Sequence, residues 1–147
     1  MFEMIDCYKK HITDCTSDIL QMLSTTKGVF FRFQAGWHDI GNKSWGMIYS
    51  SEKEAIECCE DDDLTPDEAV LPGKSCCPDA LELMRWHDNF DDDYVVIAFK
   101  GWDTGATGHD GECVCEVLEV LNVFAYADFV TCFKKDGWVW KYKKTKE

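Results

Sequence analysis

Residues 94–121 read YVVIAFKGWDTGATGHDGECVCEVLEVL. The stretch begins with a short apolar run, Tyr94–Phe99, and ends with an alternating run, Glu112–Leu121, and both runs are typical of β-strands. Between them lie four glycines, one histidine and two aspartates. This segment exceeds the roughly two to five residues of a simple hairpin turn, so we predict a polar, mobile loop. Loops held by rigid strands often carry chemistry, which makes Glu112, where the loop meets the strand, a candidate site residue.

The residues that precede this stretch predict a helix and a strand. Apolar side chains recur at spacings of three and four over residues 3–23, a pattern typical of one amphipathic helix within residues 1–24. Val29–Gln34 is rich in β-branched and aromatic residues and predicts a strand. Arg32 lies in the middle of that apolar run, and a buried arginine requires a partner because an unpaired buried charge is very costly.

Other segments carry the start and stop signals of further elements. We predict a strand over residues 44–50, and a helix that begins at the Ser51 capping box and reaches about residue 60. A further helix is expected to begin at Ser75–Pro78, with the proline in its first turn, and to end near Phe90. Residues 125–135 predict a helix, and residues 138–142 predict a final strand after an Asp-Gly turn.

The order of these elements predicts the fold class. Helices and strands are mixed without regular alternation, which favours an α+β fold over a doubly wound parallel sheet. We expect a single domain over residues 1–147, with a mixed, mostly antiparallel sheet packed by the N-terminal helix and two further helices. Its sheet-containing body spans residues 28–142, and residues 143–147 form a frayed basic tail.

Charge and hydropathy limit the classes of partner. The formal net charge is −13, which disfavours direct contact with nucleic acid phosphates. No apolar run approaches the roughly 20 residues that cross a bilayer, and the N-terminus lacks the pattern of a signal peptide. The sequence therefore predicts a soluble cytoplasmic protein that does not enter membranes.

Nine cysteines are present, but their spacing does not suggest a structural metal site. An odd number without a secretion signal disfavours a disulfide framework. Structural zinc sites use paired Cys-x2-4-Cys knuckles, whereas this chain has two Cys-Cys pairs and one Cys-x-Cys. We expect buried thiols and no metal.

Three short pieces in order suggest a family. These are the strand around Arg32, the strand that runs into a capped helix at Tyr49-Ser50-Ser51, and the segment that ends in Asp110-Gly111-Glu112. Their order resembles the ADP-ribosyltransferase-like fold over about residues 28–121. The resemblance implies NAD as cofactor and a macromolecular target.

The resemblance also implies roles for individual residues. Arg32 corresponds to the first-strand arginine that holds the dinucleotide, and Tyr49, Ser50 or Ser51 to the position beside the nicotinamide. Glu112 corresponds to the late glutamate that grips the nicotinamide ribose and stabilises a cation-like transition state. Trp37 and Trp102, which lie beside glycines, would form either a cleft for a flat ring or a protein-binding patch.

The chain departs from the family pattern at each motif. Phe33 follows Arg32 in place of the usual glycine. Tyr49-Ser50-Ser51 stands where the family has Ser-Thr-Ser, and Asp110 stands where it has the first Glu or Gln of a Glu-x-Glu or Gln-x-Glu pair.

Two runs of aspartates support an alternative function. An acidic protein could use them to imitate nucleic acid and block a basic groove of a host nucleic-acid-handling protein. Anti-defence inhibitors encoded by mobile elements share this size and charge. Under this hypothesis the protein is not an enzyme, and Arg32 is a structural partner of Glu112 or Glu116. The residues expected to bind the partner are Asp61, Asp62, Asp63, Asp91, Asp92 and Asp93.

Overall fold

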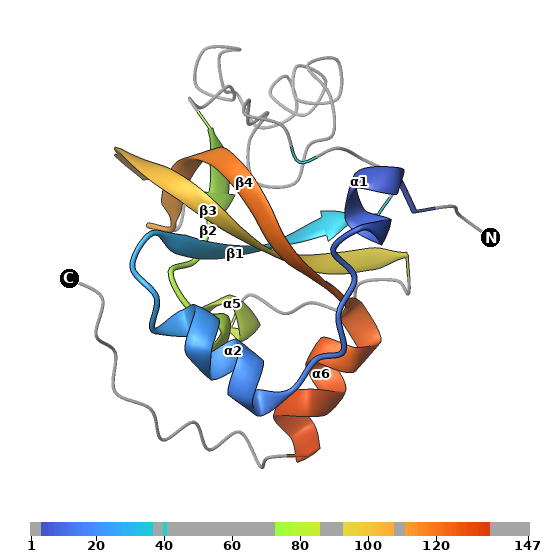
Figure 1. Cartoon of the computed structure of the whole chain (residues 1–147). Helices are drawn as coiled ribbons and strands as arrows, with labels where there is room; N and C mark the ends of the chain where they lie inside the picture. Colours follow the sequence, from blue (N-terminus) through green and yellow to red (C-terminus); the bar gives the residue numbers. More distant parts are fainter. Residues whose placement is uncertain (1–3, 37–39, 41–72, 86–92, 108–110, 136–147) are drawn as a thin grey trace, which may run out of the picture.

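The centre of the fold is an antiparallel pair of long strands, β3 (Tyr94–Thr107) and β4 (Cys113–Ala125). The computed structural model describes residues 4–36, 40, 73–85, 93–107 and 111–135 (Figure 1). Strand β1 (Val29–Ala35) pairs antiparallel with β3, and the short β2 (Lys74–Cys76) pairs antiparallel with β4. The four strands have the order β1-β3-β4-β2, and the α+β prediction is confirmed.

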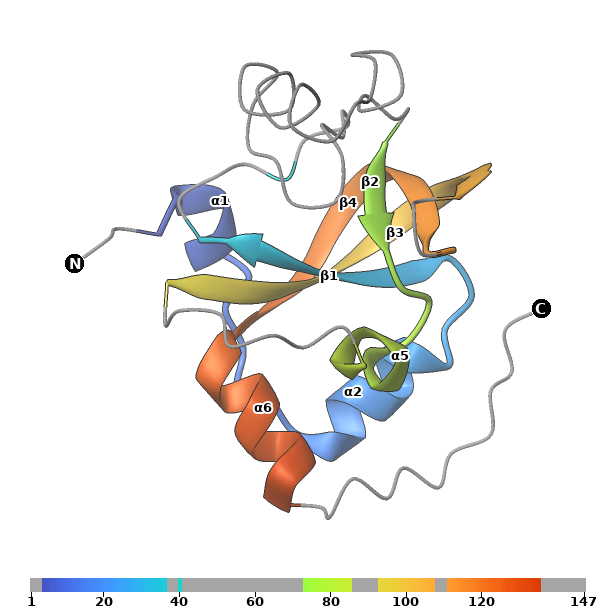
Figure 2. The same cartoon turned by 180° about the vertical axis from the view of Figure 1, so that it is seen from behind.

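The two outer strands of this order meet each other. The backbone N–H of Phe31 donates to the carbonyl oxygen of Cys77 at 2.8 Å, and the N–H of Cys77 donates to the carbonyl oxygen of Phe31 at 2.9 Å. The sheet is therefore curled, and the chain that leaves β2 closes against the middle of β1 (Figure 2). This closure places side chains of β1 beside β2.

Apolar side chains pack on both faces of the sheet. Helices α2 (Ser17–Ser24), α5 (Ala80–Met84) and α6 (Tyr126–Lys135) cover one face, and α1 (Asp6–Lys9) lies on the other (Figures 1 and 2). The buried cluster on the helix side includes Leu20, Phe31, Val96, Ala98, Phe124, Phe129 and Phe133. The buried cluster on the α1 side includes Tyr8, Val95, Ile97, Phe99, Cys115 and Val123. The predicted helix over residues 125–135 is confirmed as α6.

The prediction of one continuous N-terminal helix is wrong. The chain between α1 and α2 runs beside β4: the N–H of Val123 donates to the carbonyl oxygen of His11, and the N–H of Thr13 donates to the carbonyl oxygen of Val123, both at 2.9 Å. Thr16 then begins a new helix, because its side chain accepts a hydrogen bond from the N–H of Ile19 at 3.3 Å. The apolar spacing is thus satisfied by two helices with a β-bridge between them.

The polar loop predicted after Phe99 is largely strand. β3 continues to Thr107 through bulges in its pairing with β4. Gly101 is needed here for close packing, since an added Cβ would lie 2.9 Å from a ring carbon of Phe99 and 3.0 Å from one of Phe30. The prediction of a mobile loop over residues 101–107 is therefore wrong, because glycines on a strand can serve close contact as well as flexibility.

The helix predicted to begin at Ser75–Pro78 begins later and ends sooner. Residues 74–76 form β2, and the Asp79 side chain caps α5 by accepting from the N–H of Glu82 at 2.8 Å. Gly73 precedes β2 at φ 138°, where an added Cβ would lie 2.5 Å from the carbonyl oxygen of Cys115. Close backbone contact with β4 thus overrides the local helix signal.

Several predicted elements lie outside the described residues. They are the strand over 44–50, the helix over 51–60, the strand over 138–142 and the tail over 143–147. Within the described ranges, no helix is long and apolar enough to cross a membrane.

Candidate functional site

Arg32 is a buried residue of β1 whose guanidinium is held by two polar side chains. It lies on the α1 side of the sheet, the same side as Phe30, and its exposed fraction is 7%. Its Nε donates to Oε1 of Gln34 at 2.9 Å, and its Nη1 donates to both the carbonyl oxygen and Oγ of Ser75 at 2.9 Å. The closure between β1 and β2 brings Ser75 within reach, so the curl of the sheet creates this arrangement.

The electrostatic surroundings of Arg32 include Glu112. Burial lowers the pKa of the Arg32 guanidinium, while several nearby acidic groups, Glu112 among them, act in the opposite direction. Glu112 itself is 6% exposed and lies directly before β4. Two candidate residues that are far apart in the sequence are thereby brought into one buried region.

Several thiols lie near Arg32 or Glu112. Burial is the main cause of the raised pKa of the Cys77 thiol and of the Cys113 thiol, and the charge of Glu112 adds to both shifts. The pKa of the Cys76 thiol is also raised, chiefly by a hydrogen bond with Cys115 and then by burial. The raised pKa favours the protonated form of these three thiols, which makes them poor nucleophiles at neutral pH. We call the set of Arg32, Glu112, Cys76, Cys77, Cys113 and Cys115 the β1–β4 centre.

The described residues contain no group of three or more His, Cys, Asp or Glu side chains arranged to hold a metal ion. The seven cysteines in these ranges are all thiols. In the β1–β4 centre, Cys76 and Cys113 face each other across β2 and β4, while Cys77 takes part in the backbone bridge to Phe31. Because neighbouring residues of a strand point to opposite faces, Cys76 and Cys77 belong to the buried clusters on opposite sides of the sheet.

Trp102 is not brought to the β1–β4 centre. Its side chain is 65% exposed, and the neighbouring Gly101 faces Phe99 and Phe30. Alternation along β3 therefore places Trp102 on the opposite side of the sheet from Arg32. The other predicted residues Trp37, Tyr49 and Ser50 lie outside the described residues.

The aspartates expected to bind a basic partner fall almost entirely outside the described part of the chain. Asp93 is within it, and its carbonyl oxygen accepts a hydrogen bond from the N–H of Gly36 at 2.8 Å. This bond ties the chain before β3 to the end of β1, so the Asp93 backbone has a structural role. The remaining predicted acids, which lie outside the described residues, are Asp61, Asp62, Asp63, Asp91 and Asp92.

The partners of Arg32, Gln34 and Ser75, were not predicted from the sequence. A buried arginine signalled that a partner must exist, but Glu116, one of the two proposed acids, is exposed on β4. Ser75 and Gln34 carry no motif. Ser75 could be found only from the pairing of β2 with β4 and the closure onto β1.

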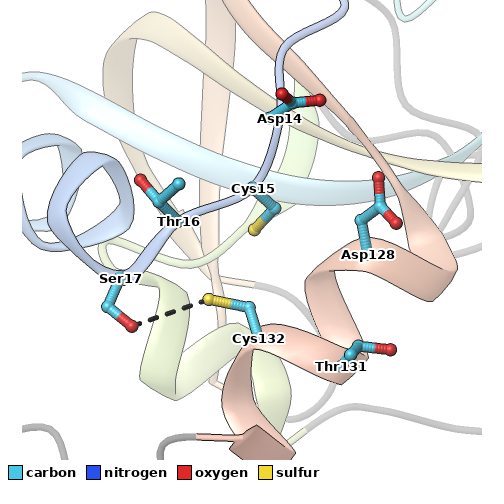
Figure 3. A pocket seen from close by; sticks show the side chains of 7 residues that line it. All are labelled: Asp14, Cys15, Thr16, Ser17, Asp128, Thr131 and Cys132. Carbon is cyan, nitrogen blue, oxygen red and sulfur yellow. Dashed lines mark hydrogen bonds between the residues drawn. The ribbon is translucent and has the colours of Figure 1, made fainter.

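A cavity of about 410 Å³ lies elsewhere, between the chain that enters α2 and helix α6 (Figure 3). Burial, followed by the neighbouring Cys132, raises the pKa of the Cys15 thiol, and the Ser17 Oγ lies 3.7 Å from the Cys132 Sγ. No sequence pattern indicated this cavity, because its two sides come from opposite ends of the chain. Its lining combines two carboxylates, three hydroxyls and two thiols, from Asp14, Cys15, Thr16, Ser17, Asp128, Thr131 and Cys132.

Comparison with protein-family models, with curated proteins and with solved structures found no match. The assignment of a function therefore rests on the residues and geometry described above.

Proposed function

We propose that the protein is an ADP-ribosyltransferase-like, NAD-binding protein that modifies a macromolecular target, with Glu112 as its central carboxylate. The observation that supports the proposal is that Arg32 and Glu112 are both buried, at 7% and 6% exposed, and that Glu112 is one of several acidic groups that oppose the lowering of the Arg32 pKa. These are the two charged family-like positions that fall within the described residues, and they come from distant parts of the sequence.

The chemistry assigned to Glu112 follows from the bond that is broken. Cleavage of the nicotinamide–ribose bond builds positive charge on the ribose, and a carboxylate beside it stabilises that charge. Arg32 then has a positioning role, since Ser75 and Gln34 already occupy its Nε and Nη1. This differs from the direct grip on the dinucleotide that the family resemblance implies.

Glu112 must become accessible if it is to act on NAD. Glu112 has an exposed fraction of only 6%, so NAD binding must uncover its carboxylate. If Glu112 instead remains covered, the β1–β4 centre is a structural polar cluster. The two cases differ in how the protein responds to NAD.

The test is a comparison of NAD-dependent melting temperatures. Ligand at about a hundredfold above its Kd stabilises a protein by about 2.7 kcal/mol, which for a chain of this size raises Tm by roughly 5–10 °C. We expect this shift, together with nicotinamide release, for the wild type and for Glu116→Gln, which changes an exposed acid on β4. Glu112→Gln should lose both. A wild type that shows neither an NAD-dependent shift nor nicotinamide release would falsify the proposal.

A second candidate function is an acidic, non-enzymatic inhibitor that occupies a basic groove of another protein. The net charge of −13 favours it. Two exposed apolar side chains, Trp102 on β3 and Leu118 on β4, also favour it. Two results together would favour this function. The protein captures a basic partner in a complex that weakens steeply with rising salt, and its own Tm does not respond to NAD.

A further inference from the structure

The part of β3 and β4 farthest from α6 carries a face of exposed side chains (Figure 1). We define the outer arm face as Lys100, Trp102, Glu116, Leu118 and Glu119, all of which are exposed. Trp102 lies opposite Glu116 in the strand pairing, and Lys100 lies opposite Glu119. Leu118 is the extra residue of the bulge between these two pairs.

This face continues the helix-covered side of the sheet. Val96 and Ala98 pack in the buried cluster beneath the helices, whereas the side chains farther along β3, Lys100 and Trp102, extend beyond that cover. Trp102 is 65% exposed and Leu118 is 57% exposed, and both are among the few large apolar side chains that the described surface presents to solvent. Single exposed apolar side chains are common on protein surfaces, whereas Trp102 and Leu118 lie on neighbouring strands and together make an apolar patch.

The arm is held in a fixed conformation. The Thr104 hydroxyl donates to the carbonyl oxygen of Val114 at 2.8 Å, and Asp103 Oδ1 accepts from the N–H of Gly105 at 2.9 Å. On the opposite side, Gly101 packs closely against Phe99 and Phe30. A preformed face of this kind loses little conformational freedom on binding, which favours its use in recognition.

The charges on the face select the partner. Lys100 is paired with Glu119, and Trp102 with Glu116, across the two strands. Because the side chains of paired residues lie on the same face, Glu116 is the acid that neighbours Trp102. An indole face next to a carboxylate suits a guanidinium or ammonium group, through cation–π and charge interactions. A second copy of this chain and a nucleic acid are both disfavoured by the net charge of −13.

We propose that the outer arm face docks a basic protein surface, with an arginine or lysine between Trp102 and Glu116 and an apolar side chain on Leu118. This docking does not depend on NAD chemistry. If the protein is an ADP-ribosyltransferase, the partner is the target that it modifies; otherwise it is the protein that it inhibits.

The probe is a short fluorescein-labelled peptide of alternating Arg and Leu, with a Gln-Leu peptide as control, titrated with the full chain by anisotropy. We expect Trp102→Ala to weaken binding about tenfold or more, as for an aromatic hot spot. Glu116→Gln should weaken it about two- to fivefold and reduce its salt dependence. Met22→Ala, which truncates an exposed apolar side chain on α2, should leave binding unchanged.

The same variants separate this proposal from the NAD proposal. Leu118→Ser and Glu116→Gln should weaken peptide binding and retain the NAD-dependent Tm shift, whereas Glu112→Gln should retain peptide binding and lose the Tm shift. Equal binding of the wild type and Trp102→Ala would overturn the docking site and assign binding to diffuse negative charge. A dimer in sedimentation that Trp102→Ala dissociates would also overturn it, in favour of a second copy of the chain.

Discussion

Arg32 and Ser75 are joined by two hydrogen bonds, both 2.9 Å long, from one guanidinium nitrogen to the serine carbonyl oxygen and to its Oγ. The two residues belong to β1 and β2, the strands at opposite ends of the sheet order. A single side chain therefore fastens the curled sheet across its closure, next to the backbone bridge between Phe31 and Cys77.

Ser75→Ala should destabilise the protein by about 1–3 kcal/mol, because it removes one acceptor from a buried charged donor while the carbonyl acceptor remains. Urea unfolding followed by circular dichroism measures the change. Ser17→Ala is the matched control: its hydroxyl is 3.7 Å from a thiol, and we expect a change below about 0.5 kcal/mol. Equal effects of the two substitutions would show that the Arg32–Ser75 contact contributes little.

Gly73→Ala should be far more damaging than Gly28→Ala. Both glycines have positive φ, 138° and 84°, but an added Cβ at Gly73 would lie 2.5 Å from the Cys115 carbonyl oxygen, whereas at Gly28 it meets nothing within 4 Å. We expect about 1 kcal/mol for Gly28→Ala from backbone strain alone, and more than about 3 kcal/mol for Gly73→Ala. Thermal unfolding of both variants measures the difference, and similar melting temperatures would contradict the close approach of Gly73 to β4.

Cys113 should react slowly with iodoacetamide. Burial raises the pKa of its thiol from 9.0 to about 11, so at pH 8 its thiolate fraction is about a hundredfold lower than that of an ordinary thiol. Peptide mass spectrometry should find Cys7, which is exposed, labelled first, and Cys113 labelled faster as pH rises towards 11. Labelling of Cys113 as fast as Cys7 at pH 8 would contradict the raised pKa of the half-buried Cys113 thiol.

The raised pKa of Cys113 also makes stability depend on pH. The folded-state pKa lies above the unfolded value, so the neutral thiol stabilises the folded state fully below about pH 9. This contribution is lost as pH rises from 9.0 to about 11. Cys113→Ser should flatten the fall in Tm over this interval.

Local patterns predicted the parts of the fold that depend on local chemistry. The apolar run at Val29–Gln34 is the core of β1, and the two runs that flank the glycine-rich segment are β3 and β4. The requirement of Arg32 for a partner also followed from sequence, because a buried charge must be satisfied.

The errors arise where distant segments decide the structure. The bridge of His11 and Thr13 to Val123 divides the predicted helix, and no local pattern contains that pairing. Likewise, Ser75 is a strand residue only because β4 lies beside it. In the candidate site, the shared role of Arg32 and Glu112 stays a prediction from family resemblance, whereas the contact of Ser75 with Arg32 follows only from the curl of the sheet.

The bridge between Phe31 and Cys77 also bears on association between chains. Strand edges expose backbone donors and acceptors that can recruit strands from other molecules, and natural proteins protect such edges. Here the chain leaving one outer strand satisfies backbone groups in the middle of the other. The protein thus shields part of its own sheet edge from aggregation, and substitutions that open this closure should promote self-assembly before they cause complete unfolding.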